Sequence, residues 1–428
     1  MTRWLGNVLI KKVAGGWHGS WIGKGNSNDP TRRSHMLSTE HKAIVRATVP
    51  LLEAGGEALT THFYGILLSE HPEVRPYFNQ ANQLSGEQPR ALANGVLMYA
   101  KHIDRLEALG DLVGMIVNKH VSLRIRREHY PVVGACLLRA IREVLGPEIA
   151  TDAVIDAWGA AYGQLANILA GAEEAIYDEQ AVAPGGWRDG RAFRVVEKAP
   201  ESDEITSFRF APVDGGDVYA HTPGQYIGLR VSVDGQDMRR NYSLSAAANG
   251  KTYRISVKRQ PGGAVSNFLH DQVQVGDTVE LFPPAGHFTL EESERDVVLI
   301  SGGVGITPTL AMLEQALVTR RPIHFIHAAR HGGVHAFRDA IDELAARHPN
   351  LKRYYCYEAP RAGDPEPHAT GFLDRDLLAA WLPATDAMDA YFLGPKPFMK
   401  SVRNALRDLG VPDARAKYEF FGPASSLD

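Results

Sequence analysis

The spacing of apolar residues along the chain changes twice, near residue 183 and again near residue 294. Between Ser38 and about Tyr177, apolar residues recur at every third or fourth position, a period that predicts helices with one buried face. Ser38 or Thr39 can cap the first of these helices. The clearest apolar stripes run over 92–103, 133–144 and 154–169. The first part of the chain is therefore predicted to be a small all-α domain.

After Ala183–Trp187, a Gly- and Pro-containing stretch that predicts a linker, apolar and polar residues alternate over short runs. Turns rich in Gly, Pro and Asp separate these runs. Close spacing with this turn chemistry predicts an antiparallel β-barrel. The predicted strands are 193–197, 205–210, 226–231, 253–258 and 278–282.

From about residue 294 onward, strand-like and helix-like segments follow one another in alternation, which predicts a parallel, doubly wound α/β sheet. The predicted strands are 297–300, 323–327, 351–358 and 390–393, and the predicted helices are 309–317, 336–347 and 398–409. We therefore expect domains at 36–183, 184–293 and 294–428.

Composition narrows the class of protein without assigning a function. A chain of 428 residues is too long for one core, and its net charge of −4 gives no electrostatic reason to expect nucleic acid or an anionic membrane as a partner. Its apolar runs are far shorter than the roughly 18 residues of a transmembrane helix. The two cysteines, Cys136 and Cys356, are expected to be unpaired and buried in a cytoplasmic protein.

Residues 1–35 differ from the rest, because they contain six Lys or Arg residues against one acid, Asp29. The segment has no apolar stretch followed by a small-residue cleavage site, which argues against a secretory signal. A disordered tail, or a true start at Met36, is the preferred interpretation, with a basic transit-like peptide as an alternative.

A glycine turn follows the first predicted strand of the α/β part. Gly303 and Gly305 lie in this turn, Thr307 can cap the next helix, and Pro308 suits the first position of that helix. Backbone N–H groups at a helix start favour a pyrophosphate. The third glycine of the usual dinucleotide fingerprint is absent, so the turn alone is equally compatible with a plain strand–helix connection.

The motif Arg240-Asn-Tyr-Ser243 supplies the missing context, together with Pro223–Tyr226 before it and Gly262–Ser266 after it. In this order these motifs resemble the ferredoxin–NADP reductase superfamily, in which the barrel holds FAD and the α/β lobe holds NAD(P)H. The resemblance implies a flavin site at Tyr226, Arg240, Asn241, Tyr242, Ser243, Gly262, Gly263 and Ser266. It implies a dinucleotide site at Gly303, Val304, Gly305, Ile306, Thr307 and Pro308.

Two C-terminal segments, 390–395 and 418–423, also match that superfamily. By resemblance the second segment lies near the flavin and contributes Glu419, Phe420, Phe421, Gly422 and Pro423. Leu393 departs from the pattern, because the superfamily usually has cysteine there. Arg330, after the second strand, is compatible with a 2′-phosphate site and equally with an exposed, solvated arginine.

His120 lies on an apolar helical stripe, where a histidine is more often a satisfied core residue than a metal ligand. The neighbouring motifs change that balance, because as a set they resemble the flavohaemoglobins, which are globin–reductase fusions. The resemblance runs from about Met36 to the C-terminus. The motifs are His62-Phe-Tyr64, Pro76-Tyr-Phe78, Glu87-Gln88, Lys119-His120, His129-Tyr130-Pro and 156–163.

The resemblance implies haem b with His120 as the proximal iron ligand. Tyr130 and Glu173 would hydrogen-bond the far ring nitrogen, although Glu173, like the adjacent Glu174, can also be read as a solvated helix-end acid. On the distal side the implied residues are Tyr64, Gln88, the haem-wedging Phe78 and the pocket-capping Leu92.

The implied fold is an all-α globin, then an antiparallel β-barrel for FAD, then a doubly wound α/β domain for NAD(P)H. The implied activity is that of a nitric oxide dioxygenase, in which NO and O2 become nitrate with electrons from NAD(P)H. We expect a cytoplasmic monomer. Two alternatives remain: a haem-independent flavin reductase whose helical domain binds a partner, and a gas-sensing globin.

Overall fold

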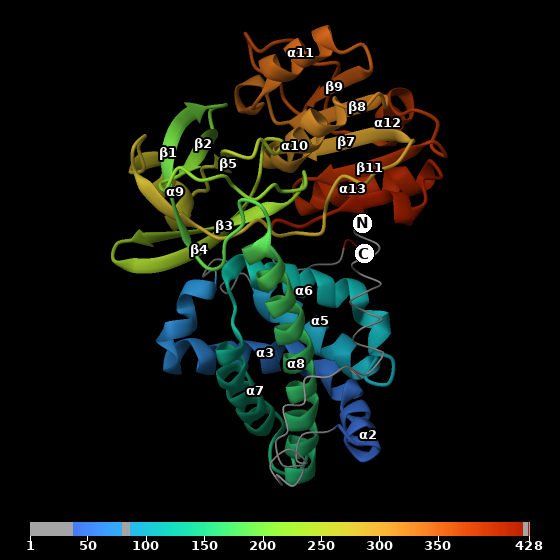
Figure 1. Cartoon of the computed structure of the whole chain (residues 1–428). Coiled ribbons are helices and arrows are strands. Elements are labelled where there is room, and N and C mark those ends of the chain that lie inside the picture. The colour runs from blue at the N-terminus through green and yellow to red at the C-terminus, as the bar shows by residue number, and fades with distance from the viewer. Residues whose placement is uncertain (1–36, 79–85, 423–426, 428) are drawn as a thin grey trace. The chain divides into compact units, whose positions relative to one another are not determined.

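The computed structural model describes residues 37–78, 86–422 and 427, and the chain divides into two compact units between Glu179 and Gln180 (Figure 1). The first unit is helical and the second contains two sheets. The predictions made for residues 1–35 and for Pro423 lie outside the described residues. Within the described part of the chain, no helix combines the length and the apolar character needed to cross a bilayer.

The predicted apolar stripes pack together in the helical unit. Val96 and Tyr99 from the first stripe, Leu137 from the second and Trp158 from the third are all buried in one core. Ser38 is the N-cap of the first helix, because its hydroxyl accepts the His41 N–H at 3.1 Å. The helices are α2 (Thr39–Ala47), α3 (Val49–Glu70), α5 (Glu87–Lys101), α6 (Gly110–Leu123), α7 (Tyr130–Leu145) and α8 (Asp152–Val182).

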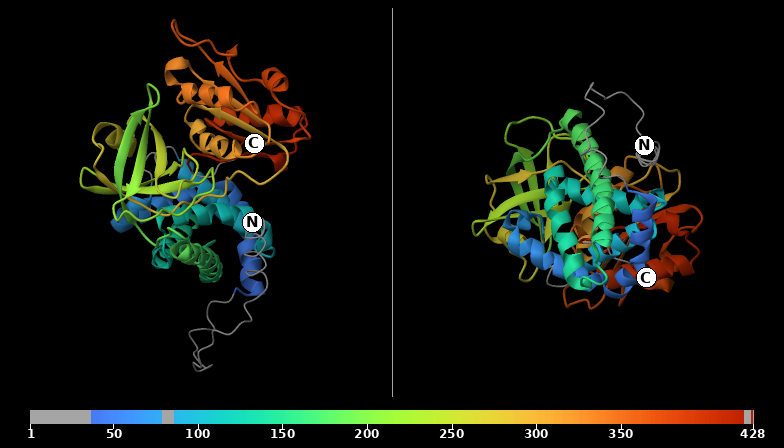
Figure 2. Two further views of the ribbon diagram at one scale, coloured as in Figure 1. Left: turned by 45° about the horizontal axis from the view of Figure 1, so that its top comes forward. Right: turned by 90° about the horizontal axis from the view of Figure 1, so that it is seen from below.

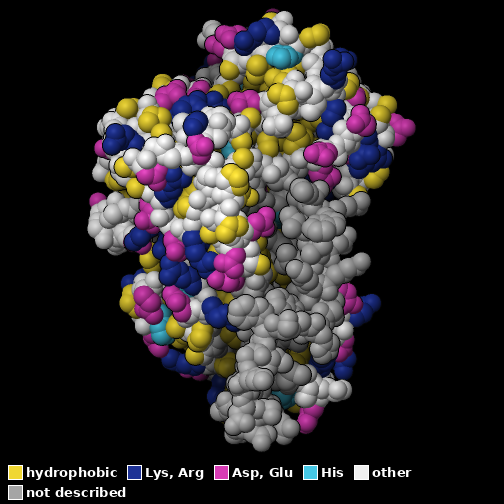
Figure 3. All heavy atoms as spheres, in the orientation of Figure 1, with side chains coloured by type: hydrophobic (Ala, Val, Ile, Leu, Met, Phe, Trp, Pro, Cys, Tyr) yellow, Lys and Arg dark blue, Asp and Glu magenta, His cyan; other side chains and the backbone are white. Residues whose placement is uncertain are grey.

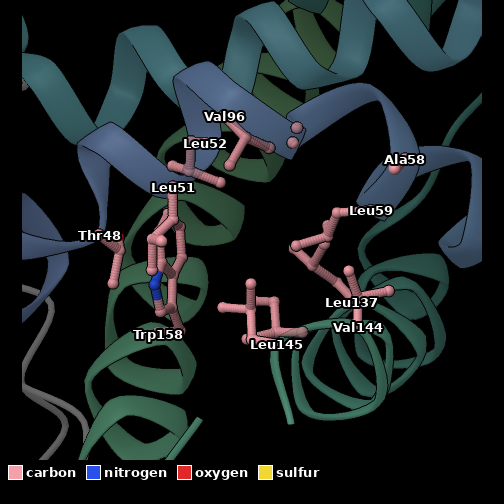
Figure 4. Close-up of a pocket in the computed structure, with 13 residues that line it drawn as sticks. Thr48, Leu51, Leu52, Ala58, Leu59, Val96, Leu137, Val144, Leu145 and Trp158 are labelled. Carbon is pink, nitrogen blue, oxygen red and sulfur yellow. The ribbon is translucent and has the colours of Figure 1, made fainter. Parts of the chain in front are cut away.

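Figure 4 shows an apolar pocket between these helices. Leu51 and Leu59 of α3, Val96 of α5, Leu137 of α7 and Trp158 of α8 all contribute to its wall. Its lining is almost entirely hydrocarbon, and such a cavity stays free of ordered water because it offers too few hydrogen-bonding partners. The pocket marks a place where the helical core is packed less tightly.

The first sheet of the second unit is antiparallel, with the strand order β4-β3-β6-β1-β2-β5. A bridge between Leu244, just after β4, and Ile255 of β5 joins the two ends of this order, so the sheet closes into a barrel (Figures 1 and 2). The strands are β1 (Arg191–Pro200), β2 (Ile205–Pro212), β3 (Tyr226–Val233), β4 (Gln236–Ser243), β5 (Tyr253–Lys258) and β6 (Thr278–Leu281). The helix α9 (Ala264–Asp271) buries Val265 and Leu269 in the barrel core.

The predicted linker at 183–187 is wrong at its last residue, because Trp187 is buried. The helix α8 ends at Val182 and Gly185 turns the chain with φ of +67°, as a connection requires. Trp187, however, is only 9% exposed, and its ring lies 5.6 Å from Phe193 and 6.1 Å from Tyr253 between centroids. The burial of this large aromatic side chain places it in the barrel core rather than in a solvated linker.

The second sheet is entirely parallel, with the order β10-β9-β8-β7-β11-β12, which confirms the doubly wound topology. Helices α10 and α11 pack on one face and α12 and α13 on the other. The strands are β7 (Asp296–Gly302), β8 (Ile323–Ala329), β9 (Leu351–Tyr357), β10 (Ala369–Thr370), β11 (Met388–Leu393) and β12 (Ala416–Tyr418). The helices are α10 (Ile306–Ala316), α11 (Arg338–Arg347), α12 (Arg375–Trp381) and α13 (Lys396–Asp408).

The predicted capping of α10 is wrong. The helix begins at Ile306, and a 3₁₀ turn at Gly303–Gly305 precedes it. Thr307 therefore lies inside the first turn, where its hydroxyl donates to the Val304 carbonyl at 3.0 Å instead of capping. Pro308 is the third helical residue, a position that tolerates proline because N–H groups of the first turn have no intrahelical partner.

Candidate functional site

His120 lies on α6 and meets two residues that are distant in sequence. Its Nδ1 atom lies 2.7 Å from Glu173 Oε1 and 3.1 Å from the hydroxyl oxygen of Tyr130. Tyr130 donates its own hydroxyl hydrogen to the same Glu173 oxygen at 2.6 Å. The exposed Glu174 beside it does not occupy this position, so the geometry selects Glu173.

The burial of this group decides which protons it holds. Burial, and then the nearby Glu173 carboxylate, raise the pKa of Tyr130 above its usual value, so the phenol stays protonated and can donate. Glu173 is 1% exposed, and within the described residues its Oε2 has no hydrogen-bond partner. The hydroxyl of Tyr162 donates to the Tyr130 carbonyl at 2.7 Å and so fixes the backbone there.

This arrangement fits haem iron. Because Glu173 and Tyr130 both engage Nδ1 of His120, the ring is oriented with Nε2 as the atom available to a metal. The His120 side chain is 31% exposed, so it is accessible to a prosthetic group. A carboxylate behind a ligating imidazole is the arrangement that strengthens its donation to a metal.

The predicted distal residues gather around Tyr64 on α3. Its ring lies 5.6 Å from that of Phe78 in an edge-on arrangement, and its hydroxyl is hydrogen-bonded to the Gln88 side chain of α5. Burial raises the pKa of Tyr64, so its hydroxyl remains a donor at neutral pH. Leu92, one helical turn beyond Gln88, is partly buried against the same core.

The predicted flavin residues lie on the hairpin of β3 and β4. Tyr226 pairs with Ser243, Ile227 with Tyr242, and Leu229 with Arg240. Because paired residues of an antiparallel ladder share a face, Tyr242 and Arg240 lie on the face of the core residues Ile227 and Leu229. Tyr226, Asn241 and Ser243 lie on the opposite face. The structure therefore brings these five predicted flavin residues together on one hairpin, but their side chains lie on two opposite faces of it.

Arg240 has the properties of an anion ligand. Its guanidinium is partly buried, and burial lowers its pKa because desolvation disfavours the charged form. One nitrogen donates to the Arg239 carbonyl at 2.7 Å, and no carboxylate among the described residues forms an ion pair with it. A partly desolvated cation of this kind fits the pyrophosphate of FAD.

The second predicted phosphate segment is more constrained than expected. The Gly263 N–H donates to the Gln260 carbonyl at 2.9 Å, and the Ser266 hydroxyl accepts the Gln260 N–H at 3.2 Å. The Gly263 N–H, which was predicted to meet phosphate, is therefore used within the turn, and the Ser266 hydroxyl donates its own hydrogen to the Gly263 carbonyl at 3.3 Å. Gly262 adopts a φ of +70° beside them, and the free N–H groups at the start of α9 come from Ala264 and Val265.

The glycine turn lies at the switch point of the parallel sheet, where β7 ends between β8 and β11. Gly303 has a φ of +55°, and a Cβ at Gly305 would lie 2.4 Å from the Leu393 carbonyl oxygen. Both positions therefore require glycine. No side chain caps α10, but the N–H of its first residue, Ile306, already donates to the Gly303 carbonyl within the preceding 3₁₀ turn. A dinucleotide pyrophosphate fits this place.

The described C-terminal residues differ in exposure. Glu419 is buried, and Phe420 packs edge-on against Tyr418 with the ring centroids 5.6 Å apart. Phe421 is 50% exposed, which leaves one aromatic face open to a planar ligand, and Gly422 follows with a φ of +141°. Leu393, which replaces the usual cysteine, is fully buried in the core beside the glycine turn.

Sequence reasoning missed a buried polar group beneath the dinucleotide turn. Ser301 of β7 and His327 of β8 are register partners, and the Ser301 hydroxyl lies 2.8 Å from His327 Nδ1. The His327 ring stacks on that of His335 at 4.4 Å between centroids. Burial lowers the pKa of His327 to about 3, so this imidazole is neutral. Polar residues at the ends of adjacent predicted strands were the available signal.

Two ion pairs join the barrel to the parallel sheet. Arg254 of β5 lies 3.1 Å from Glu314 of α10, whose other carboxylate oxygen accepts the Ala247 N–H at 2.7 Å. Arg330, after β8, binds Glu204 in the turn between β1 and β2. Glu204 was not identified from the sequence, because nothing near it in the chain indicates this contact.

Comparisons with known proteins agree along the whole described chain. Residues 61–169 match the globin family, 192–290 the oxidoreductase FAD-binding domain and 299–404 the oxidoreductase NAD-binding domain. A flavohemoprotein of Burkholderia sp. (strain TH2) is 67% identical over 393 residues, covering 92% of this chain and all of that protein.

Two solved structures are also similar. A flavohemoglobin from Malassezia yamatoensis with bound FAD and heme has a TM-score of 0.80 and 26% identity, covering 90% of this chain and 100% of its own. The FAD/NAD-binding domain of a nitric oxide dioxygenase from Vibrio cholerae has a TM-score of 0.51 and 41% identity. It covers 55% of this chain and 100% of its own.

Proposed function

The chain belongs to the flavohemoprotein family, and from this premise we propose that it is an NAD(P)H-dependent nitric oxide dioxygenase that converts NO and O2 to nitrate. The observation that carries the proposal is the His120–Glu173–Tyr130 hydrogen-bonded group in a chain that also contains an FAD-binding and an NAD-binding domain. The similarity to the nitric oxide dioxygenase domain of Vibrio cholerae supports the same reaction.

When bound, haem b supplies iron that reacts with O2, and FAD supplies the conversion of a two-electron donor into single electrons. The proximal residues set the character of the iron ligand. Glu173 accepts the Nδ1 hydrogen of His120 and so increases the basicity of the imidazole. Tyr130 holds that carboxylate in place through its own hydroxyl.

The distal residues supply a hydrogen-bond donor. Tyr64 keeps its proton because burial raises its pKa, and Gln88 orients its hydroxyl. A fixed donor in a pocket with little water stabilises negative charge that develops on a diatomic ligand. Phe78 and Leu92 line the same region and exclude water from it.

In the second unit, Arg240 would neutralise the flavin pyrophosphate, with Tyr226, Asn241, Tyr242 and Ser243 around it on the β3–β4 hairpin. The turn of Gly303 and Gly305 and the start of α10 would hold the NAD(P)H pyrophosphate. The residues at 419–422 would contact the flavin, with Phe421 offering its exposed ring.

The test is NO consumption by the purified protein. His120→Ala should abolish NO consumption and remove the haem absorption, while NADH oxidation with an artificial electron acceptor persists because the flavin site is intact. If NO consumption survived this substitution, the haem would not be the site of reaction. In that case the alternative, a flavin reductase with a partner-binding helical domain, would be favoured.

We also propose a cytoplasmic monomer with domains at 36–183, 184–293 and 294–428. Cys136 and Cys356 are both free and buried, which suits a reducing compartment. Basic and acidic side chains are interspersed over the face in Figure 3, which supports small molecules rather than nucleic acid as partners. Light scattering of the purified protein tests the oligomeric state, and cell fractionation tests the location.

A further inference from the structure

Arg330 occupies the position that distinguishes the two nicotinamide dinucleotides. It directly follows β8, the strand beside β7, and Gly302 at the end of β7 pairs with Ala328. In doubly wound sheets the residue after the second strand lies near the adenosine ribose. An acidic residue there binds the 2′-hydroxyl of NADH, and an arginine accommodates the 2′-phosphate of NADPH.

The side chain of Arg330 is not alone at this position, because Glu204 from the barrel forms an ion pair with it. The same Glu204 carboxylate lies 3.1 Å from Lys258 Nζ on β5. Arg330 is 56% exposed, so the pair is open to solvent and to a ligand. An exposed ion pair of this kind contributes little to folding stability, so stability alone does not account for it.

Backbone contacts hold both partners of this ion pair in place. The Arg259 N–H donates to the Glu204 carbonyl at 2.7 Å, and the Asp203 N–H donates to the Gly333 carbonyl at 2.9 Å. On the other side, the Ala359 N–H donates to the Arg330 carbonyl at 2.9 Å. Because these bonds fix the backbone near both residues, the fold itself holds the Glu204 side chain next to Arg330.

We propose that Glu204 makes the enzyme prefer NADH by occupying the guanidinium that a 2′-phosphate would need. A 2′-phosphate would have to displace the carboxylate and then lie next to its negative charge. The neutral 2′-hydroxyl of NADH meets no such repulsion. The inference rests on the proposed function, because it concerns the dinucleotide that supplies that reaction.

The test compares Glu204→Gln with the unchanged protein. Glutamine keeps the size of the side chain and removes its charge, so kcat/KM for NADPH should rise about tenfold while kcat/KM for NADH changes less than about twofold. Glu197→Gln is the matched control, because Glu197 pairs with Arg209 at 2.8 Å on the same barrel. This control should leave the NADPH-to-NADH ratio unchanged.

A binding measurement separates this inference from catalysis. Calorimetry with 2′,5′-ADP and 5′-AMP, which differ only by the 2′-phosphate, should show Glu204→Gln strengthening the binding of 2′,5′-ADP alone. The gain should be smaller when the same substitution is made in an Arg330→Ala background, because the phosphate then has no guanidinium to bind.

An unchanged ratio of the two affinities in Glu204→Gln would overturn the inference, whether or not the protein consumes NO. A gain of equal size in the Arg330→Ala background would also overturn it. If instead the ratio shifts as expected but the protein does not consume NO, the inference stands and the proposed function fails.

Discussion

A single carboxylate oxygen of Glu173 accepts hydrogen bonds from both His120 and Tyr130. Because both donors converge on one atom, the imidazole orientation and the position of the negative charge are set together. Tyr64 on the distal side is held in a similar way, by burial and by Gln88. In both places hydrogen bonding and burial fix the protonation state and the orientation of a side chain that would otherwise be an ordinary core aromatic or helix-end acid.

Glu173→Gln should lower the rate of NO consumption by about ten- to a hundredfold while haem is retained, because an amide polarises His120 less than a carboxylate. Resonance Raman spectroscopy of the reduced protein should show the iron–histidine stretch at lower frequency. Glu174→Gln is the control, since that exposed neighbour does not contact His120. Equal effects of the two substitutions would contradict this role for Glu173.

At the scale of elements, the periodicity of apolar residues predicted the long helices and most strands, because one buried face leaves a regular signal, whereas the short helices α9 and α12 were not predicted. The strand β4 was missed, since its sequence is polar and its pairing depends on the two-residue turn at Asp234 and Gly235, where φ is +50° and +75°. Family motifs predicted which residues of these elements bind the cofactors, and that assignment stays a prediction. Contacts such as Glu204 with Arg330 could not be predicted, because they depend on how distant segments pack.

Two helical glycines offer a test of packing. At Gly56, which borders the apolar pocket, a Cβ would meet only Ala93 Cβ, at 3.5 Å, so Gly56→Ala should raise the free energy of unfolding by about 0.5–1 kcal/mol. At Gly134 a Cβ would lie 2.5 Å from the Tyr162 ring, so Gly134→Ala should lower the free energy of unfolding by about 1–3 kcal/mol. Urea denaturation measures both, and destabilisation by Gly56→Ala would show that the pocket wall is already full.

At the scale of the whole molecule, several histidines are buried in neutral form within the parallel sheet. Burial lowers the pKa of His327 to about 3 and that of His335 well below its usual value. In the unfolded chain both imidazoles would take up protons below about pH 6.5. The folded state therefore binds fewer protons than the unfolded state in mildly acidic solution.

We expect the stability of the protein to fall as the pH falls from about 6.5 toward 3, because the unfolded state gains protons that buried His327 cannot accept. Above about pH 6.5 this contribution is fully present. Denaturation by urea at a series of pH values measures the slope, and His327→Asn should make it shallower. A slope unchanged by that substitution would show that other groups govern the acid sensitivity.

The contact of Glu314 with Arg254 and Ala247 has a consequence for engineering. The helix that begins at the dinucleotide turn is anchored through Glu314 to barrel residues that follow the Arg240–Ser243 motif. A chimera spliced between 293 and 294 would put the two partners of this contact in halves of different origin. Exchanging reductase modules between relatives should therefore transfer both sheets as one cassette, or carry over the matching acid and arginine with whichever half is moved.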